Sequence, residues 1–247
     1  MKYLIIIAHC DPNKNATAYR IANCAKESLL TANHEVKITD LISEGFDRVA
    51  TMNDFKTIPD RNKFNYIRCQ LPVENLCDEI RRQQELIKWC DHVIVFGAMF
   101  FYRFPACLYA WIDRCFTLEF GFANSNTMDN GLLKGKKASF IITTAGSESH
   151  FLSSGYSPLE SLLYSTTYGL RYCGIECTRS MGYFTANKPG TVDKEVEWIE
   201  KFKKAILKID SWPLLPVLRG KPKDGEKNEA EIFAQLDPLR FEEILYE

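Results

Sequence analysis

The sequence has no long apolar run and almost no net charge. Two of its longest hydrophobic stretches are YLIIIA at 3–8 and HVIVFGAMFFY at 92–102. Both are well below the roughly 20 residues that a membrane-spanning helix requires. The 31 Lys and Arg residues nearly balance the 32 Asp and Glu residues, and the formal net charge is −1. We therefore expect neither membrane insertion nor nucleic-acid binding.

Metal-binding and disulfide patterns are also missing. The nine cysteines include no C-x-x-C pair, and the four histidines form no H-x-x-x-H pair, so we expect no metal site. Reduced, buried thiols in a cytoplasmic protein are favoured over a disulfide framework. The first residues, MKYLIIIAHCD, lack the apolar core and cleavage site of a signal peptide, which favours the same compartment.

What the sequence does contain is a regular alternation of apolar strands and amphipathic helices. Strands are expected at 3–8, 34–41, 91–98, 136–146 and 175–184, and helices at 15–32, 73–90, 105–120, 158–174 and 192–209. Asn15 or Thr17 is placed to cap the first helix, and Pro105 lies in the first turn of the third. This alternation predicts an α/β fold with a doubly wound, five-stranded parallel sheet and helices on both faces.

Two segments fall outside this alternation. Residues 43–73 are polar and irregular, which predicts a long excursion from the fold. From Trp212 on, a charged run, RGKPKDGEKNEAE, precedes the end PLRFEEILYE, which is typical of a peripheral arm. We expect one domain over 1–211 and a C-terminal extension over 212–247, with a partner subunit as one surface on which it can pack.

Ligands of open parallel α/β sheets bind beyond the carboxyl ends of the strands, and three loops there carry unusual residues. The first, AHCDPNKNATA at 8–18, precedes a helix N-terminus, where free N–H groups favour a phosphate. His9, Asn15 and Thr17 add side-chain donors. The chain has neither a G-x-G-x-x-G nor a Walker motif, and a plain capped helix explains the loop equally well.

The second loop places three aromatic residues, Phe100, Phe101 and Tyr102, where the third strand ends. Exposed aromatic faces are unfavourable in water unless something flat, such as a heteroaromatic ring, covers them. A dimer interface is the alternative cover, and the two can coexist. The third loop, ITTAGSES at 142–149, offers small residues and two threonine hydroxyls, or is simply a turn. Together the loops predict a phosphate-bearing aromatic cofactor, without distinguishing a flavin from a nucleotide.

Three motifs, in matching order and strand context, carry a resemblance to a known family. AHCDPN, F-x-x-P-A-x-L-x-x-W-I-D-R-x-F and TTAGS follow the first, third and fourth strands. They resemble the NAD(P)H:quinone oxidoreductases, the DT-diaphorase-like enzymes with a flavodoxin-like fold, from about residue 3 to 210. The resemblance implies a homodimer with FAD, rather than FMN, in a site at the subunit interface. It also implies a ping-pong reaction in which NAD(P)H reduces the flavin by two-electron hydride transfer, and a quinone then takes both electrons.

The resemblance assigns residues of this chain to the cofactor. The phosphate-contacting loop corresponds to His9, Asn15, Ala16 and Thr17. The loop that binds the isoalloxazine ring corresponds to Ala98, Met99, Phe100, Phe101 and Tyr102. The loop under the pyrimidine edge of the flavin corresponds to Thr143, Thr144, Ala145 and Gly146.

The chain departs from the family at the catalytic positions. A tyrosine and a histidine that help to stabilise the reduced flavin in the animal enzymes correspond here to Phe151 and Ser157. Phe151 cannot donate a hydrogen bond, and Ser157 cannot hold a proton as imidazole does. Tyr156 and His150 are the nearby candidates to replace them.

The substrate pocket differs as well. Two tyrosines of the family's pocket correspond to Phe122 and Asn124, and the pocket expected here consists of Phe101, Phe122, Asn124 and His150. A flat apolar slot beside a flavin predicts small planar acceptors, namely quinones and also nitroaromatic and azo compounds.

Three other functions compete with this enzyme. The first is a flavoprotein regulatory subunit with little turnover, because some relatives of this fold are ancillary proteins of potassium-efflux transporters. The second is a one-electron carrier, although such carriers usually have a more acidic surface than a net charge of −1 provides. The third is a binding module that keeps the fold without the flavin.

Overall fold

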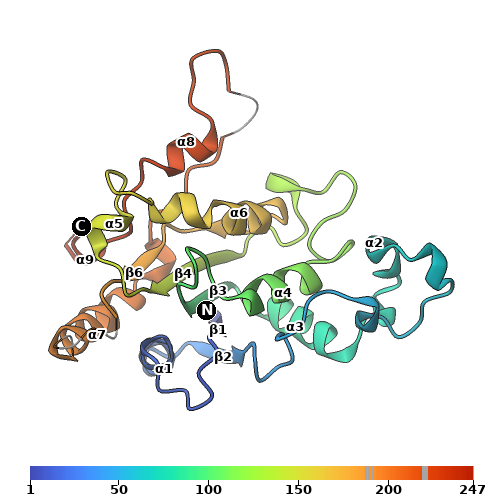
Figure 1. The fold of residues 1–247 in the computed structure, drawn as a ribbon, viewed down its shortest axis with the longest axis horizontal. Helices are drawn as coiled ribbons and strands as arrows, with labels where there is room; N and C mark the ends of the chain where they lie inside the picture. Colours follow the sequence, from blue (N-terminus) through green and yellow to red (C-terminus); the bar gives the residue numbers. More distant parts are fainter. Residues whose placement is uncertain (187, 189, 191, 219–221, 247) are drawn as a thin grey trace.

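A computed structural model describes residues 1–186, 188, 190, 192–218 and 222–246. Its centre is a sheet (Figure 1) formed by β1 (Lys2–Ala8), β2 (Glu35–Asp40), β3 (His92–Ala98), β4 (Lys137–Thr143), β5 (Glu176–Cys177) and β6 (Met181–Tyr183). The strand order is β2-β1-β3-β4-β5, β6 also pairs with β4, and every pairing between these strands is parallel. The predicted flavodoxin-like sheet is confirmed.

The fifth predicted strand is interrupted between β5 and β6. There the N–H of Ser180 donates to the buried carboxylate of Glu160, and the N–H of Arg179 donates to the carbonyl of Pro213 at 2.8 Å. These two N–H groups therefore do not hydrogen-bond to β4, and the single predicted strand is observed as two short strands.

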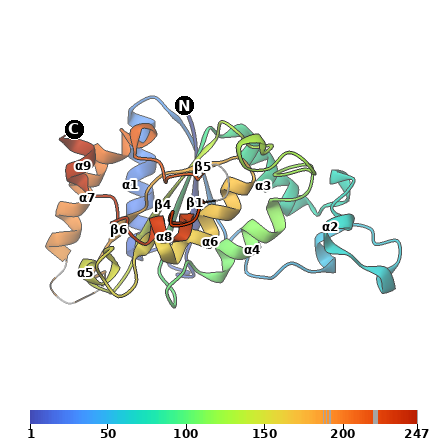
Figure 2. The same cartoon turned by 90° about the horizontal axis from the view of Figure 1, so that it is seen from above.

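Helices cover both faces of the sheet (Figures 1 and 2). On one face lie α1 (Thr17–Thr31) and α7 (Val192–Ile206); on the other lie α3 (Asp78–Trp89), α4 (Ala106–Cys115) and α6 (Leu159–Tyr172). Each face has its own core, and β1 contributes Ile5 and Ile7 to the first and Leu4 and Ile6 to the second. A strand that is buried on both faces has no polar positions, which explains its unbroken apolar sequence.

The start of α1 differs from the prediction. The residue that caps it is Ala16, and neither Asn15 nor Thr17 caps it with a side chain, so that prediction is wrong. The carboxylate of Asp11 instead accepts the N–H groups of Asn13, Asn15 and Ala16 at 2.7 to 3.0 Å. These N–H groups precede the helix, so Asp11 shapes the loop before α1, and the first turn of α1 has no side-chain cap.

Other differences concern short elements and helix ends. α3 begins later and α4 ends earlier than predicted. Four short helices were not predicted, because a single turn has no amphipathic period: α2 (Tyr66–Cys69), α5 (Glu148–Phe151), α8 (Glu229–Phe233) and α9 (Phe241–Leu245). Turns of 3-10 helix lie at Met52–Asp54, Arg61–Lys63, Val73–Asn75, Met128–Asn130 and Ile209–Ser211.

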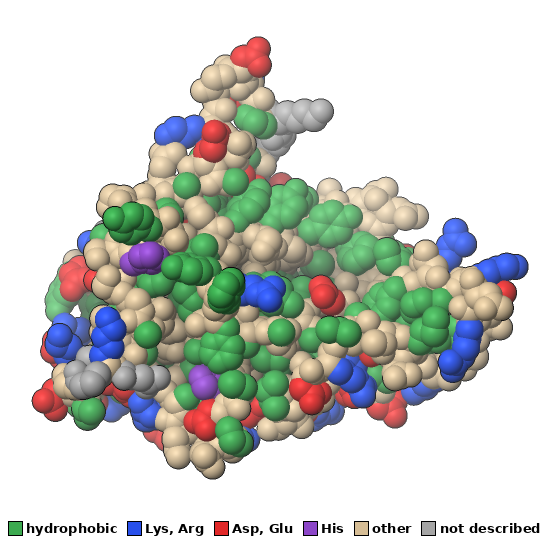
Figure 3. All heavy atoms as spheres, in the orientation of Figure 1, with side chains coloured by type: hydrophobic (Ala, Val, Ile, Leu, Met, Phe, Trp, Pro, Cys, Tyr) green, Lys and Arg blue, Asp and Glu red, His purple; other side chains and the backbone are tan. Residues whose placement is uncertain are grey.

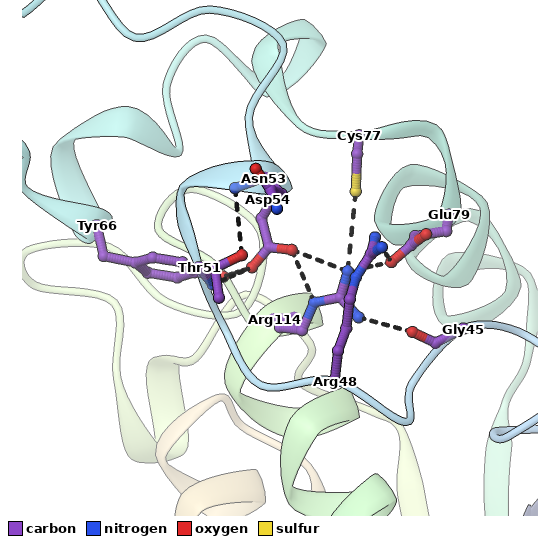
Figure 4. A network of polar contacts seen from close by, with 9 residues as sticks. All are labelled: Gly45, Arg48, Thr51, Asn53, Asp54, Tyr66, Cys77, Glu79 and Arg114. Atoms are coloured by element: carbon purple, nitrogen blue, oxygen red, sulfur yellow. Dashed lines mark hydrogen bonds and ion pairs between the residues drawn. The ribbon is translucent and has the colours of Figure 1, made fainter. Parts of the chain in front are cut away.

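The predicted excursion is anchored to the domain by a buried ion cluster (Figure 4). Arg114 of α4 is fully buried and bonds to the carboxylates of Asp54 and Glu79 and to the carbonyl of Gly45. Asp54, also fully buried, accepts the hydroxyl of Tyr66 at 2.8 Å. The excursion is therefore tied to the W-I-D-R segment of α4 through Gly45 near its start and through Asp54, and Glu79 of α3 completes the cluster.

The C-terminal arm, which we define as residues 212–246, packs on its own chain. Leu215 and Phe233 are buried in the core on the α6 side, and Leu239 and Ile244 in the core on the α1 side. A boundary at 211 and contact with a partner stay predictions. All nine cysteines are free, and six of them are buried. Within the described residues no helix has the length and apolarity to cross a membrane.

Candidate flavin site

The strand register places the starts of the three predicted loops next to one another at the carboxyl edge of the sheet. Ala8 at the end of β1 pairs with Gly97 of β3, and Ala98 pairs with Thr143 at the end of β4. The loops after β1, β3 and β4 therefore start side by side at the carboxyl edge. Figure 3 views the molecule from this edge and shows hydrophobic side chains gathered across its middle.

The loop after β3 forms a strained aromatic turn. The N–H of Phe100 donates to the carbonyl of Arg103 at 2.7 Å, and the reverse bond is 3.2 Å long. The two residues between them, Phe101 and Tyr102, have φ values of +51° and +64°. Hairpin turns with two positive φ values normally contain Asn or Gly, and other residues pay about 1–2 kcal/mol each for this conformation.

This turn holds its rings in solvent. Phe101 is 97% exposed, and Phe100 and Tyr102 are 42% and 49% exposed. The positive φ values and the solvent exposure of the rings each destabilise the folded protein. Such a combination is typical of a ligand site. Ala98 and Met99 lie just before the turn and are half-buried.

Aromatic contacts connect the turn to both neighbouring loops. The ring of His9, after β1, lies 6.1 Å from that of Phe100, and the ring of His150, in α5, lies 5.9 Å from that of Tyr102. The structure therefore brings together residues from all three loops that the sequence singled out.

The loop after β1 presents a neutral histidine. The N–H of Asp11 donates to Nδ1 of His9 at 3.0 Å, which leaves the proton of the neutral ring on Nε2. Burial lowers the pKa of His9, and this keeps the ring neutral. Thr17 is buried, and its hydroxyl donates to Glu195 at 3.1 Å. Because Asp11 already occupies the N–H groups of Asn15 and Ala16, the donors that this loop offers to a phosphate are Nε2 of His9 and the first N–H groups of α1.

The loop after β4 is compact. Thr143 and Thr144 are buried, Ala145 is exposed, and the N–H of Gly146 donates to the hydroxyl of Thr144 at 3.1 Å. A Cβ atom at Gly146 would lie 2.6 Å from the ring of Phe151, so only glycine fits there. Phe151 itself is buried and stacks on Phe184 at 5.7 Å.

His150 is the polar centre of this loop. Its ring lies 5.7 Å from Tyr156, 5.9 Å from Tyr102 and 4.9 Å from Phe151. Its Nε2 atom is buried and has no hydrogen-bond partner among the described residues. Tyr156 is 93% exposed, and the N–H of Ser157 donates to the carbonyl of His150 at 3.1 Å. A buried, unpaired imidazole nitrogen is costly unless a ligand group completes it.

The remaining pocket residues lie elsewhere on the chain. Phe122 contacts Tyr172 of α6 at 5.5 Å, and Asn124 is exposed. One hollow of about 640 Å³ lies in the excursion, and one of about 910 Å³ lies between α6 and the arm. A third, of about 630 Å³, lies between β6, α7 and the arm and reaches Glu148 of α5. The aromatic turn lines none of these three hollows and stands on an open face.

One group of possible metal ligands lies outside this edge, namely Asp54, Cys77 and Glu79. The guanidinium of Arg114 already contacts all three side chains (Figure 4). This cation neutralises the acidic pair, so the cluster carries no argument for a metal.

Comparisons with known proteins agree with this geometry. The family model described as flavodoxin-like fold matches residues 1–206. The chain is 29% identical over 202 residues to the ribosyldihydronicotinamide dehydrogenase-like protein traD of Penicillium crustosum, covering 76% of this chain and 74% of that protein. It is 28% identical over 224 residues to NAD(P)H dehydrogenase (quinone) 1 of Cavia porcellus, covering 85% of this chain and 78% of that protein.

A solved structure shows the same fold. A crystal structure of a Klebsiella pneumoniae protein superposes with a TM-score of 0.78 at 21% identity, and the match covers 89% of this chain and 88% of that one. With a family match over most of its length and quinone dehydrogenases among its relatives, the chain belongs to the flavodoxin-like fold family.

Proposed function

We propose that the protein is a flavin-dependent NAD(P)H:quinone oxidoreductase that uses FAD. The observation that carries the proposal is the strained turn that holds Phe101 in solvent between His9 and His150. An exposed ring at the carboxyl edge of the sheet offers a face on which flat ring systems stack. A relative that is named as a quinone dehydrogenase supports quinones as the acceptors.

The residues at the edge suit a flavin. The backbone of Ala98 and Met99 and the small residues from Thr143 to Gly146 would bond the edge of its ring system, as small side chains allow close approach. The Nε2–H of His9 and the first N–H groups of α1 would bind its phosphates. A bound flavin supplies the exchange of two electrons between nicotinamide and acceptor, and the protein orients both.

We assign the polar contact to the acceptor at this site to His150. Its buried Nε2 atom has no partner among the described residues, and an imidazole nitrogen can donate or accept a hydrogen bond. Tyr102 and Tyr156 hold the ring by contacts at 5.9 and 5.7 Å. Phe151 and Ser157, at the positions predicted to be catalytic, would instead shape the loop, Phe151 by stacking on Phe184 and Ser157 through its backbone N–H.

A homodimer would complete the site. The aromatic turn is open to solvent, Phe122 packs on Tyr172 of α6 rather than on the aromatic rings of the three loops, and Asn124 is exposed. A second copy that covered this face would bury the exposed aromatics and could bring its own Phe122 and Asn124 to the acceptor side. The proposed acceptors are small planar quinones, with nitroaromatic and azo compounds as further substrates.

The proposal is tested by anaerobic titration of the purified protein. NADH or NADPH should bleach the flavin absorbance within the dead time of manual mixing, and menadione should restore it. Flavin that is released by heat and separated by chromatography should be FAD. A yellow protein that barely bleaches would favour the regulatory flavoprotein, and a colourless protein that takes up no added flavin would refute both functions.

A further inference from the structure

The loop that carries His150 and Tyr156 has few bonds of its own. Between α5 and α6 the N–H of Gly155 donates to the carbonyl of Leu152 at 2.8 Å, and the N–H of Ser157 donates to that of His150 at 3.1 Å. Both bonds lie within residues 147–157, which we call the α5 loop. They shape the loop but do not fix it to the rest of the protein.

Phe151 seats the start of this loop in the core by stacking on Phe184, and the C-terminal arm provides the polar attachment beyond it. Asp237 Oδ1 accepts the backbone N–H of Ser153 at 2.8 Å and its hydroxyl at 2.7 Å. Nearby, Nε of Arg240 lies 3.2 Å from a carboxylate oxygen of Glu148. The second contact is half exposed and therefore weak. The bonds of Asp237 are stronger because a charged acceptor takes both donors of one residue.

The arm can hold the loop because the arm itself is firmly seated. Leu239 is buried, and its N–H donates to the carbonyl of Ser180 at 2.8 Å. Arg179 donates to the carbonyl of Asp237 at 2.7 Å and pairs with Glu243. The bonds from Ser153 hold the pKa of Asp237 below its usual range, so its carboxylate is charged at neutral pH.

We propose that Asp237 is a positioning residue that fixes the α5 loop, and with it His150 and Tyr156, at the acceptor side of the site. This role rests on the proposed function, because it assigns a purpose to residues of the flavin site. In this role the arm supports the active site of its own subunit. A loop released from Asp237 would still border the site but would no longer hold its rings against Tyr102.

The first measurement is hydrogen exchange of the full chain, which requires no flavin. In Asp237→Ala, exchange of the Ser153 amide should accelerate at least tenfold. In Asp237→Asn, which keeps an oxygen acceptor, it should stay within threefold of the wild type. The matched control is Asp224→Ala, which removes the same charge from an exposed site in the arm and should leave exchange unchanged.

The second measurement is steady-state kinetics with menadione. Asp237→Ala should raise KM for menadione about tenfold with kcat and the Kd for FAD within twofold, and Asp237→Asn should restore KM. Ser153→Ala, which removes only the hydroxyl, should raise KM about threefold and replaces Asp237→Ala if that variant does not fold. Unchanged exchange, or faster exchange with unchanged KM, would overturn the proposal. A wild type without quinone turnover refutes the proposed function instead, and the exchange data then decide whether Asp237 holds the loop.

Discussion

Removal of the Asp54 carboxylate should be among the most damaging single changes to the fold. Asp54 and Arg114 are both fully buried and lie 2.9 Å apart. Asp54 also accepts the hydroxyl of Tyr66 at 2.8 Å and the N–H of Thr51 at 3.0 Å. In Asp54→Ala, the donors of Arg114, Tyr66 and Thr51 lose their acceptor, and that of Arg114 is fully buried. The excursion also loses its main bond to α4.

The magnitude follows from what remains around Arg114. Breaking a buried ion pair from one side costs about 3–5 kcal/mol. Glu79 and the carbonyl of Gly45 still accept from the guanidinium (Figure 4), so the lower end of that range applies. We expect a loss of about 3 kcal/mol in the free energy of unfolding, which is more than a hundredfold in the folding equilibrium.

Urea unfolding, followed by far-UV circular dichroism, measures this loss. Tyr66→Phe removes one of the three bonds and should cost about 1 kcal/mol. Asp47→Ala removes an exposed carboxylate from the same excursion and should leave the transition unchanged. A loss below about 1 kcal/mol for Asp54→Ala, with an unchanged denaturant slope, would show that water or Glu79 fully replaces Asp54 and would refute the argument.

Three further changes test the site and its support. Phe101→Gly should stabilise the apoprotein by about 0.5–1 kcal/mol in urea unfolding, since glycine adopts the φ of +51° without strain. The same change should raise KM for menadione. Equal stability of the variant and the wild type would mean that the turn is unstrained. Burial raises the pKa of Glu160 from 4.5 to about 7, so the folded state keeps a proton that the unfolded state releases, and stability should fall as pH rises from 4.5 to 7. Glu160→Gln should abolish that fall in melts across this range, and an unchanged slope would assign it to another group. Gly146→Ala should weaken binding of the proposed flavin at least tenfold by fluorescence titration, because its Cβ would lie 2.6 Å from the ring of Phe151. Unaltered affinity would place the flavin elsewhere.

The strands and long helices could be predicted because buried positions are apolar. In a helix these positions recur every three to four residues, and in a strand that is buried on both faces they form a continuous run. β1 is apolar throughout since each face of the sheet has its own core. The break between β5 and β6 could not be predicted, because it depends on Glu160, which reaches Ser180 from a helix that precedes the strand. The cap predicted for α1 failed for a similar reason: Asp11 binds the N–H groups of Asn15 and Ala16, and the loop that this forms leaves α1 without a side-chain cap.

The candidate site was predictable in its position and not in its geometry. Aromatics at a strand end indicated a ring-binding loop, but nothing in the sequence indicates positive φ values at Phe101 and Tyr102, which are unusual for aromatic residues. The contact between Asp237 and Ser153 joins residues 84 positions apart, and no local pattern encodes it. Such long-range pairs become visible only once the arm is placed in three dimensions.

The exposed aromatic turn should also affect how long the protein survives in a cell. A ring that is 97% exposed beside two half-exposed neighbours is a surface that chaperones and proteases bind. A flavin or a second subunit that covers it would remove that signal. We therefore expect the half-life of the protein to shorten when cells are starved of riboflavin, as a pulse-chase measurement would show. Vitamin supply would then set the amount of this protein as well as its activity.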